Sequence, residues 1–347
     1  MRSACKTIGV VFVYAVCACW LVTGGVVAGE KKLRSMKYTP RTKQQAVAWQ
    51  RALRPRLFRL LRMDDLVARK TPIPFGPKIV SSKREKGYLL QEVEINSTPT
   101  RRMKIMLTVP TDLEGRLPAV VCIAGHGGTR RSCYDSDDYY RRFARVLAES
   151  GYVTISTDVG QHKIHEKGRA LMGERLWDLM RCVDFLASLD RVDSRRIGCA
   201  GLSLGGEMAM WLGAMDERVR ATVSAGFLTK MDQMEQDHCM CWKFPGLREL
   251  VDYADIYSLT APRALLCQNG LKEPASQFPV PLAREALAEI ELIYADFGQP
   301  ENVALAVHEG GHVVDLPSLS AFLENHLGNR ESTVRPNAPK GVDAPHR

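Results

Sequence analysis

The sequence predicts an α/β protein built on a doubly wound, mostly parallel β-sheet, and two observations predict it. First, six short runs rich in Val, Ile, Leu and Cys end at Gly or at polar residues, which is typical of parallel strands covered on both faces. These runs span residues 119–124, 152–157, 196–200, 221–225, 263–268 and 303–307. Second, longer segments with helical apolar spacing alternate with them, as in doubly wound sheets. These segments span residues 137–149, 173–189, 204–214, 281–295 and 316–327.

Four segments along the 347 residues differ in pattern. Residues 1–28 carry a positive start (Arg2, Lys6), an apolar run and a small-residue cleavage site, which predicts a signal peptide and a secreted or periplasmic protein. An uncleaved membrane anchor, or lipidation at Cys19, are the alternatives. Residues 29–86 are expected to form an N-terminal helical extension, residues 87–328 the catalytic domain with two further strands at 91–96 and 103–110, and the polar residues 329–347 a disordered tail.

The distribution of charge and the spacing of the cysteines argue against nucleic acid and against a metal ion as ligands. The formal net charge is +9, but the basic residues are scattered along the chain, which favours a solvated basic surface over a nucleic-acid site. Cys239 and Cys241 have CxC spacing without a second Cys/His pair at the spacing of a structural zinc site, so no metal site is expected there.

The strongest functional signal is the element Gly201-Leu-Ser203-Leu-Gly205, which directly follows one predicted strand and directly precedes a helix. A serine at such a sharp turn projects its hydroxyl above the sheet, next to the positive end of the helix dipole. This context predicts that Ser203 is a nucleophile.

A serine nucleophile needs a general base and an acid that orients the base. His312 follows the last predicted strand after Gly310-Gly311, and it is preferred to His308, which lies closer to the strand end. Glu273 is the carboxylate in the loop after the penultimate predicted strand. The order Ser203, Glu273, His312 is the chain order of nucleophile, acid and histidine in α/β-hydrolases.

The oxyanion of the tetrahedral intermediate needs backbone N–H donors. One is expected from Leu204, the residue after the nucleophile. The other is expected from Gly127 or Gly128, in the loop Gly125-His126-Gly127-Gly128 after the strand at residues 119–124.

Residues 308–312 read His-Glu-Gly-Gly-His, which is also the HExxH pattern of zinc metalloproteases. That chemistry needs a helix, and two adjacent glycines would cost a helix about 2 kcal/mol relative to alanine. The strand-like residues 303–307 lead straight into the motif, so this metal site is not expected.

From Pro118 to about Leu327 the chain resembles the α/β-hydrolase superfamily, in particular the branch of acetyl xylan esterases and dienelactone-hydrolase-like enzymes. The motifs that carry the resemblance span residues 124–128, 192–206, 216–221, 241–247 and 309–312. The resemblance implies an eight-stranded sheet, a serine triad, no metal or organic cofactor, and deacetylation of carbohydrate esters. Many relatives have Asp in place of Glu273, so Asp255 is an alternative acid.

The prediction is therefore a serine esterase acting on a small-molecule or oligosaccharide ester. Residues 231–247 are placed to form a cap or pocket wall, with His126, Trp242 and Phe244 as candidate pocket residues. A serine peptidase of the same fold is an alternative, although that group usually carries a large N-terminal propeller. A non-catalytic binding protein on a hydrolase scaffold is another.

Overall fold

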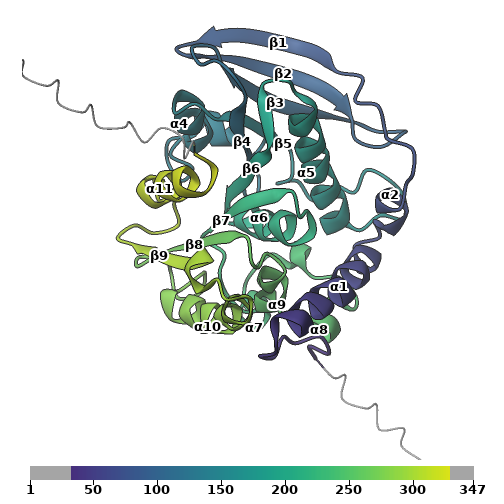
Figure 1. The fold of residues 1–347 in the computed structure, drawn as a ribbon, viewed down its shortest axis with the longest axis vertical. Helices are drawn as coiled ribbons and strands as arrows, with labels where there is room; N and C mark the ends of the chain where they lie inside the picture. Colours follow the sequence, from purple (N-terminus) through teal and green to yellow (C-terminus); the bar gives the residue numbers. More distant parts are fainter. Residues whose placement is uncertain (1–32, 329–347) are drawn as a thin grey trace, which may run out of the picture. The chain divides into compact units, whose positions relative to one another are not determined.

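The computed structural model describes residues 33–328, so the predicted signal peptide and the predicted C-terminal tail lie outside the described residues. A nine-stranded sheet runs through the described part in the order β1-β2-β3-β5-β4-β6-β7-β8-β9 (Figure 1). The strands are β1 (Lys78–Glu85), β2 (Tyr88–Asn96), β3 (Arg102–Pro110), β4 (Leu117–Ile123), β5 (Val153–Thr157), β6 (Val192–Leu202), β7 (Val219–Ala225), β8 (Ala264–Gly270) and β9 (Val303–His308).

The first three strands form an antiparallel meander, and β3 also pairs antiparallel with β5. All neighbouring pairs from β5 to β9 are parallel. The doubly wound, mostly parallel sheet predicted from the sequence is therefore confirmed, and each of the six buried runs is a strand. Because parallel strands end at one edge of the sheet, the loops after β4, β6, β8 and β9 meet there.

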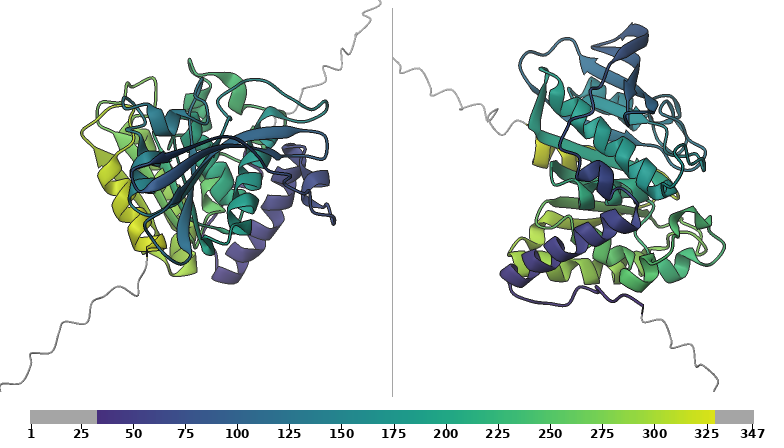
Figure 2. Two further views of the ribbon diagram at one scale, coloured as in Figure 1. Left: turned by 90° about the horizontal axis from the view of Figure 1, so that it is seen from above. Right: turned by 90° about the vertical axis from the view of Figure 1, so that its right-hand side faces the viewer.

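Helices cover both faces of the sheet, as Figures 1 and 2 show. One apolar core includes side chains of α1, α5, α6, α9 and α10, and a second includes side chains of α3, α4 and α11. The helical elements are α1 (Lys43–Leu60), α2 (Asp64–Val67), α3 (Ser132–Asp135), α4 (Phe143–Glu149), α5 (Leu171–Ser188), α6 (Leu204–Met215), α7 (Met231–Met234), η1 (Met240–Trp242), α8 (Leu247–Leu250), α9 (Tyr253–Ser258), α10 (Val280–Phe297), η2 (Pro300–Asn302) and α11 (Leu316–Leu327).

The segment expected to be a helical extension is helical only in its first part. Residues 78–85 form β1, which pairs antiparallel with β2 and adds a ninth strand to the eight that the resemblance implied. The strand was missed because it buries no apolar face: it is exposed along nearly its whole length, including Ile79 and Val80. A strand without a buried face lacks the alternation from which strands are recognised.

The N-terminal segment is also packed into the main apolar core. Ala46, Leu53 and Leu57 of α1 are fully buried in the main core. Ahead of the helix, Arg34 forms a bidentate pair with Asp255. Within the helix, Gln50 donates to the carbonyls of Ser258 and Ala261. The part of this segment from Leu33 onward is thus packed into the same structural unit as the sheet.

Helix α4 begins later than predicted, at Phe143 instead of residue 137. Arg141 and Arg142 both have positive φ angles, of 52° and 51°, which an α-helix of L-residues does not accommodate.

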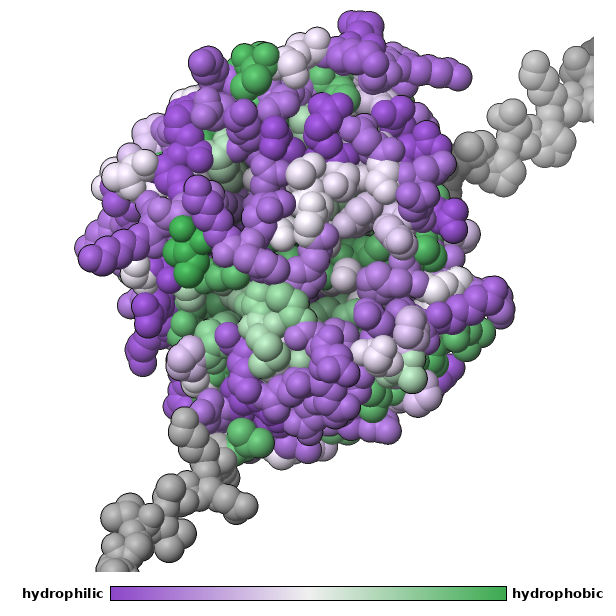
Figure 3. Space-filling view, turned by 180° about the vertical axis from the view of Figure 1, so that it is seen from behind, coloured by the Kyte–Doolittle hydropathy of each residue, from purple (hydrophilic) through white to green (hydrophobic). Residues whose placement is uncertain are grey.

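Within residues 33–328, no helix is both long and apolar enough to cross a bilayer. The face drawn in Figure 3 is mostly hydrophilic, with an apolar patch near its middle.

Candidate active site

Ser203 stands at a strained turn between β6 and α6. Its φ and ψ are 62° and −126°, which is a rare conformation for a residue with a side chain. The Ser203 N–H donates to the Ala225 carbonyl of β7, at 2.9 Å. Strain of this kind persists where the surrounding structure enforces it and is concentrated at functional sites.

Glycines on both sides of Ser203 make the turn sterically feasible. A Cβ on Gly201 would lie 2.2 Å from the Gly205 carbonyl oxygen, and a Cβ on Gly205 would lie 2.2 Å from the Ile123 carbonyl oxygen. Both distances are far below van der Waals contact, so only glycine fits at these two positions. The GxSxG spacing thus lets strand β6, helix α6 and the end of β4 approach one another at Ser203.

His312 and Glu273 form the second part of the site. His312 Nδ1 lies 2.8 Å from Glu273 Oε1, and the Glu273 side chain is almost completely buried. The His312 ring also stacks on Phe278, with the two ring centroids 5.5 Å apart. A buried carboxylate bonded to Nδ1 selects the tautomer in which Nε2 is free to accept a proton.

The loops that carry Glu273 and His312 are joined to each other by backbone contacts. The Lys272 N–H donates to the Gly310 carbonyl at 2.9 Å, and a Cβ on Gly270 would lie 2.3 Å from that same oxygen. His308 lies at the end of β9, where its Nδ1 accepts from the Gly310 N–H. Residues 308–312 are therefore not helical, and the metalloprotease alternative lacks the geometry it needs.

Gly226 links the Ser203 turn to His312. It follows Ala225, the acceptor of the Ser203 N–H, and has a φ of 56°. A Cβ at this position would lie 2.9 Å from Cε1 of His312. The structure thus brings Ser203, His312 and Glu273 to one place, the carboxyl end of the sheet. No hydrogen bond joins Ser203 to His312 in the described residues, and such contacts commonly tighten only when substrate binds.

Asp255, the alternative acid, binds the N-terminal segment and not His312. Its carboxylate accepts from the Arg34 guanidinium, the Tyr38 N–H and the Asp252 N–H. These contacts tie the N-terminal segment to α9, which leaves Glu273 as the carboxylate that meets His312.

The expectation that Gly127 or Gly128 donates to the oxyanion does not fit the structure. The Gly127 N–H donates to the Gly160 carbonyl at 3.2 Å, and the Gly128 N–H donates to the Gly125 carbonyl at 3.1 Å. His126 N–H, by contrast, has no acceptor among the described residues. The Leu204 N–H lies in the first turn of α6, where helical acceptors are lacking.

The loop of residues 125–128 is packed directly against Ser203. A Cβ on Gly125 would lie 3.1 Å from Ser203 Cβ, and the Gly125 N–H donates to Tyr140 Oη at 2.8 Å. A Cβ on Gly160, which follows β5, would lie 2.4 Å from the Gly125 carbonyl oxygen. The loop is therefore held between Ser203, Tyr140 and Gly160. The sequence did not predict this role of Tyr140, because a tyrosine at an apolar position of a helical pattern is expected to be a core residue.

The predicted pocket aromatics are only partly in place. Trp242 is completely buried and packs near Tyr253, so its prediction as a pocket residue is wrong. Phe244 is partly buried against Trp211 and the main core. His126, in contrast, is exposed, and its Nε2 lies 3.1 Å from Cys241 Sγ in the segment that was expected to form a cap or pocket wall.

Glu207 is a further titratable group close to the site. It lies one turn into α6, where its N–H donates to the Ser203 carbonyl, and its side chain is buried. Burial raises the pKa of Glu207 from 4.5 to about 8. At neutral pH the carboxyl beneath Ser203 is therefore mostly neutral.

Known proteins share parts of this architecture. The model of the prolyl oligopeptidase family (Peptidase_S9) matches residues 140–263, which include Ser203 but neither Glu273 nor His312. A Bacillus subtilis protein described as "Putative hydrolase YtaP" is 24% identical over 284 residues, or 75% of this chain and 92% of that protein.

Two solved structures are similar over most of their length. One is a "putative acetyl xylan esterase" from Bacteroides fragilis, with a TM-score of 0.65, 17% identity and coverage of 80% of this chain and 79% of that one. The other is a glucuronoyl esterase from Solibacter usitatus, with a TM-score of 0.62, 16% identity and coverage of 85% and 98%. At these identities the likeness is one of fold.

Proposed function

We propose that this chain, an α/β-hydrolase by fold, is a serine esterase whose nucleophile is Ser203. The observation that carries the proposal is the meeting of a strained serine and a carboxylate-bound histidine around Gly226. A strained turn alone has other uses, and so does a buried Glu–His pair. Their convergence is what acyl transfer needs.

In the proposed mechanism, His312 Nε2 takes the proton of Ser203 Oγ as the oxygen attacks the ester carbonyl. Glu273 stabilises the imidazolium that forms. The N–H groups of Leu204 and His126 hold the oxyanion, and the dipole of α6 adds to this stabilisation. His312 then protonates the leaving alcohol, and water hydrolyses the acyl-enzyme by the reverse sequence of proton transfers.

The proposed substrates are acetyl or similar acyl esters of carbohydrates. This rests on the sequence resemblance to acetyl xylan esterases and on the fold shared with carbohydrate esterases. The signal peptide that the sequence predicts at residues 1–28 fits an enzyme that meets such polymers outside the cell. Fold alone does not determine a substrate, so the acyl group and the alcohol have to be found by assay.

A serine peptidase is the second candidate, because the prolyl oligopeptidase family model matches residues 140–263. The two candidates share a nucleophile and differ in the leaving group. Amide hydrolysis requires protonation of a poor leaving amine, whereas an ester releases a better leaving group.

A substrate panel tests the proposal. Wild type and His312→Ala are assayed against 4-nitrophenyl acetate, acetylated xylo-oligosaccharides, a methyl glucuronate ester and chromogenic prolyl peptides. Ester hydrolysis that is lost in the variant supports the esterase. Turnover of peptides alone favours the peptidase, and no turnover of any ester overturns the esterase proposal in favour of a binding protein.

A further inference from the structure

Four side chains of types that can bind a metal ion gather at the loop of residues 125–128. They are His126, His162, Cys239 and Cys241, and their ligand atoms all lie within 4.8 Å of one another. His126 Nε2 is 3.1 Å from Cys241 Sγ, and His162 Nε2 is 3.4 Å from Cys239 Sγ. In a tetrahedral zinc site with ordinary bond lengths, adjacent N and S ligands are about 3.5 Å apart and two S ligands about 3.8 Å apart.

We propose that these four residues bind a thiophilic transition-metal ion, with Zn²⁺ as the ion that the ligand set fits best. Two imidazoles and two thiols are a tetrahedral ligand set typical of structural zinc. The four residues do not follow a zinc-finger spacing, because they come from three segments far apart in the chain: the loop after β4, the loop after β5 and the segment that contains η1.

The surroundings of the cluster are arranged like the outer shell of a metal site. Arg175 of α5 donates from Nη1 to Cys241 Sγ at 3.4 Å and from Nη2 to the Gln161 carbonyl at 2.9 Å, next to His162. Hydrogen bonds to ligand sulfurs and to the adjoining backbone orient metal ligands.

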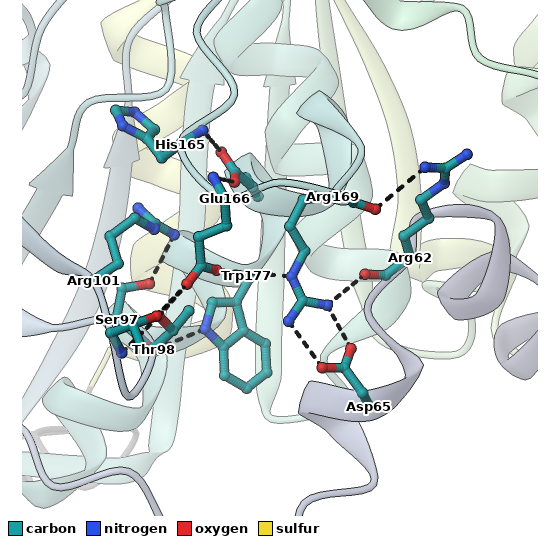
Figure 4. A network of polar contacts seen from close by, with 12 residues as sticks. Arg62, Asp65, Ser97, Thr98, Arg101, His165, Glu166, Arg169 and Trp177 are labelled. Atoms are coloured by element: carbon teal, nitrogen blue, oxygen red, sulfur yellow. Dashed lines mark hydrogen bonds and ion pairs between the residues drawn. The ribbon is translucent and has the colours of Figure 1, made fainter.

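The loop that carries His162 is held in place by a polar network, which is drawn in Figure 4. Glu174 accepts from the N–H groups of His165 and Glu166. Glu166 in turn accepts from Thr98, and Arg169 pairs with Asp65 of α2. A ligand on an anchored loop loses little freedom when it binds an ion.

A metal ion bound by these four residues would restrain the loop of residues 125–128, in which the His126 N–H is proposed to bind the oxyanion. His126 belongs to that loop, so an ion at this site would tie the loop to the η1 segment and to the loop after β5. The metal site stands on the positions of the four side chains and does not depend on the proposed esterase activity.

The test is metal binding by the reduced, metal-free full chain. Co²⁺ is titrated into wild type, Cys239→Ser, Cys241→Ser and His162→Gln, followed by displacement with Zn²⁺. We expect one Co²⁺ per wild-type chain, with the visible d–d bands and near-ultraviolet thiolate charge-transfer bands of tetrahedral cobalt, and loss of these bands in each variant. Loss of a ligand should weaken binding by at least about 100-fold, beyond what removal of an outer-shell partner costs.

Two matched variants serve as controls. His165→Gln lies in the same loop as His162, and Cys133→Ala removes a buried thiol outside the cluster. Both should bind Co²⁺ as wild type does, and Zn²⁺ should protect Cys239 from thiol reagents in wild type and both controls. Absence of the cobalt bands in wild type, or bands that persist unchanged in both cysteine variants, overturns the proposal.

Discussion

Glu273 Oε1 lies 2.8 Å from His312 Nδ1, and the Glu273 side chain is only 1% exposed. The second carboxylate oxygen, Oε2, is buried and has no hydrogen-bond partner among the described residues. A carboxylate with so few other partners is stabilised mainly by the imidazole it meets, and it stabilises the imidazolium in return. This relationship makes Glu273 a sensitive point for mutation.

Glu273→Gln should reduce kcat by about 10²- to 10⁴-fold with little change in KM. The amide keeps the shape of the side chain but removes the charge that stabilises His312 in its protonated form, and it can select the wrong tautomer. Steady-state kinetics on 4-nitrophenyl acetate measures this.

Two other carboxylates provide the contrast. Asp255→Asn should destabilise the fold, because it weakens the pair with Arg34, while kcat of the remaining folded enzyme stays near wild type. Glu309→Gln, at an exposed position in the His-Glu-Gly-Gly-His sequence, should change neither the stability of the fold nor kcat. If Asp255→Asn abolished turnover at unchanged folded fraction while Glu273→Gln did not, the assignment of the acid would be wrong.

Gly226→Ala should lower kcat by about 100-fold, because the new methyl group would displace the His312 ring, and misplacement of a catalytic group by about 1 Å has effects of that size. It should also cost about 1–2 kcal/mol of stability, from its positive φ. Gly298→Ala is the matched control, since Gly298 has a φ of 69° and open space around it. Both variants should lose stability from the positive φ, but only Gly226→Ala should lose kcat, and equal kcat values would contradict this role of Gly226.

Tyr140→Phe should lower kcat by about tenfold. The substitution leaves the Gly125 N–H without its acceptor, which costs about 1–3 kcal/mol for a buried donor and loosens the loop of residues 125–128. The neighbouring Tyr139 is exposed, so Tyr139→Phe tests whether loss of a hydroxyl in this region is enough. Tyr140→Phe should have a lower kcat than Tyr139→Phe, and identical kinetics would count against a role for Tyr140.

Glu207 predicts a pH dependence of stability. Its pKa is about 8 in the fold against 4.5 for the free group, so between these values the folded state holds a proton that the unfolded state has released. Stability therefore falls as pH rises from about 4.5 to about 8. Glu207→Gln removes this dependence. The free energy of unfolding of the variant should therefore rise relative to that of wild type as the pH rises, and the difference should change by a few kcal/mol by pH 8.

Denaturant unfolding at pH 5 and pH 8 measures the Glu207 effect. Other buried carboxyls with raised pKa values, such as Asp178, contribute equally to both proteins, so the difference isolates Glu207. A stability difference that does not change between the two pH values would show that Glu207 is ionised in the fold.

The sequence predicted the parts of the molecule that local patterns encode. Buried apolar runs identified the parallel strands, and the GxSxG element identified the turn at Ser203. The positions of Glu273 and His312 after the last two predicted strands, together with chain order, paired the two residues, and the structure places their side chains in contact.

What the sequence could not predict depends on side chains that meet across the fold. Whether Gly127, Gly128 or His126 has a free N–H depends on Gly160 and on the loop's own folding, which no spacing reveals. Trp242 looked like a pocket residue because aromatic residues line both cores and pockets, and only its complete burial separates the two. The His126, His162, Cys239 and Cys241 cluster is distributed over three segments, so a search for ligand spacing misses it.

Covalent labelling of Ser203 tests the central claim most directly. The full chain is treated with a fluorophosphonate, and intact mass and peptide mapping locate the adduct in wild type and in Ser203→Ala, with ester turnover measured on the same samples. We expect one adduct in wild type, on Ser203, that forms as turnover is lost, and neither adduct nor turnover in Ser203→Ala. An adduct at another residue, or ester turnover retained by Ser203→Ala, would contradict it.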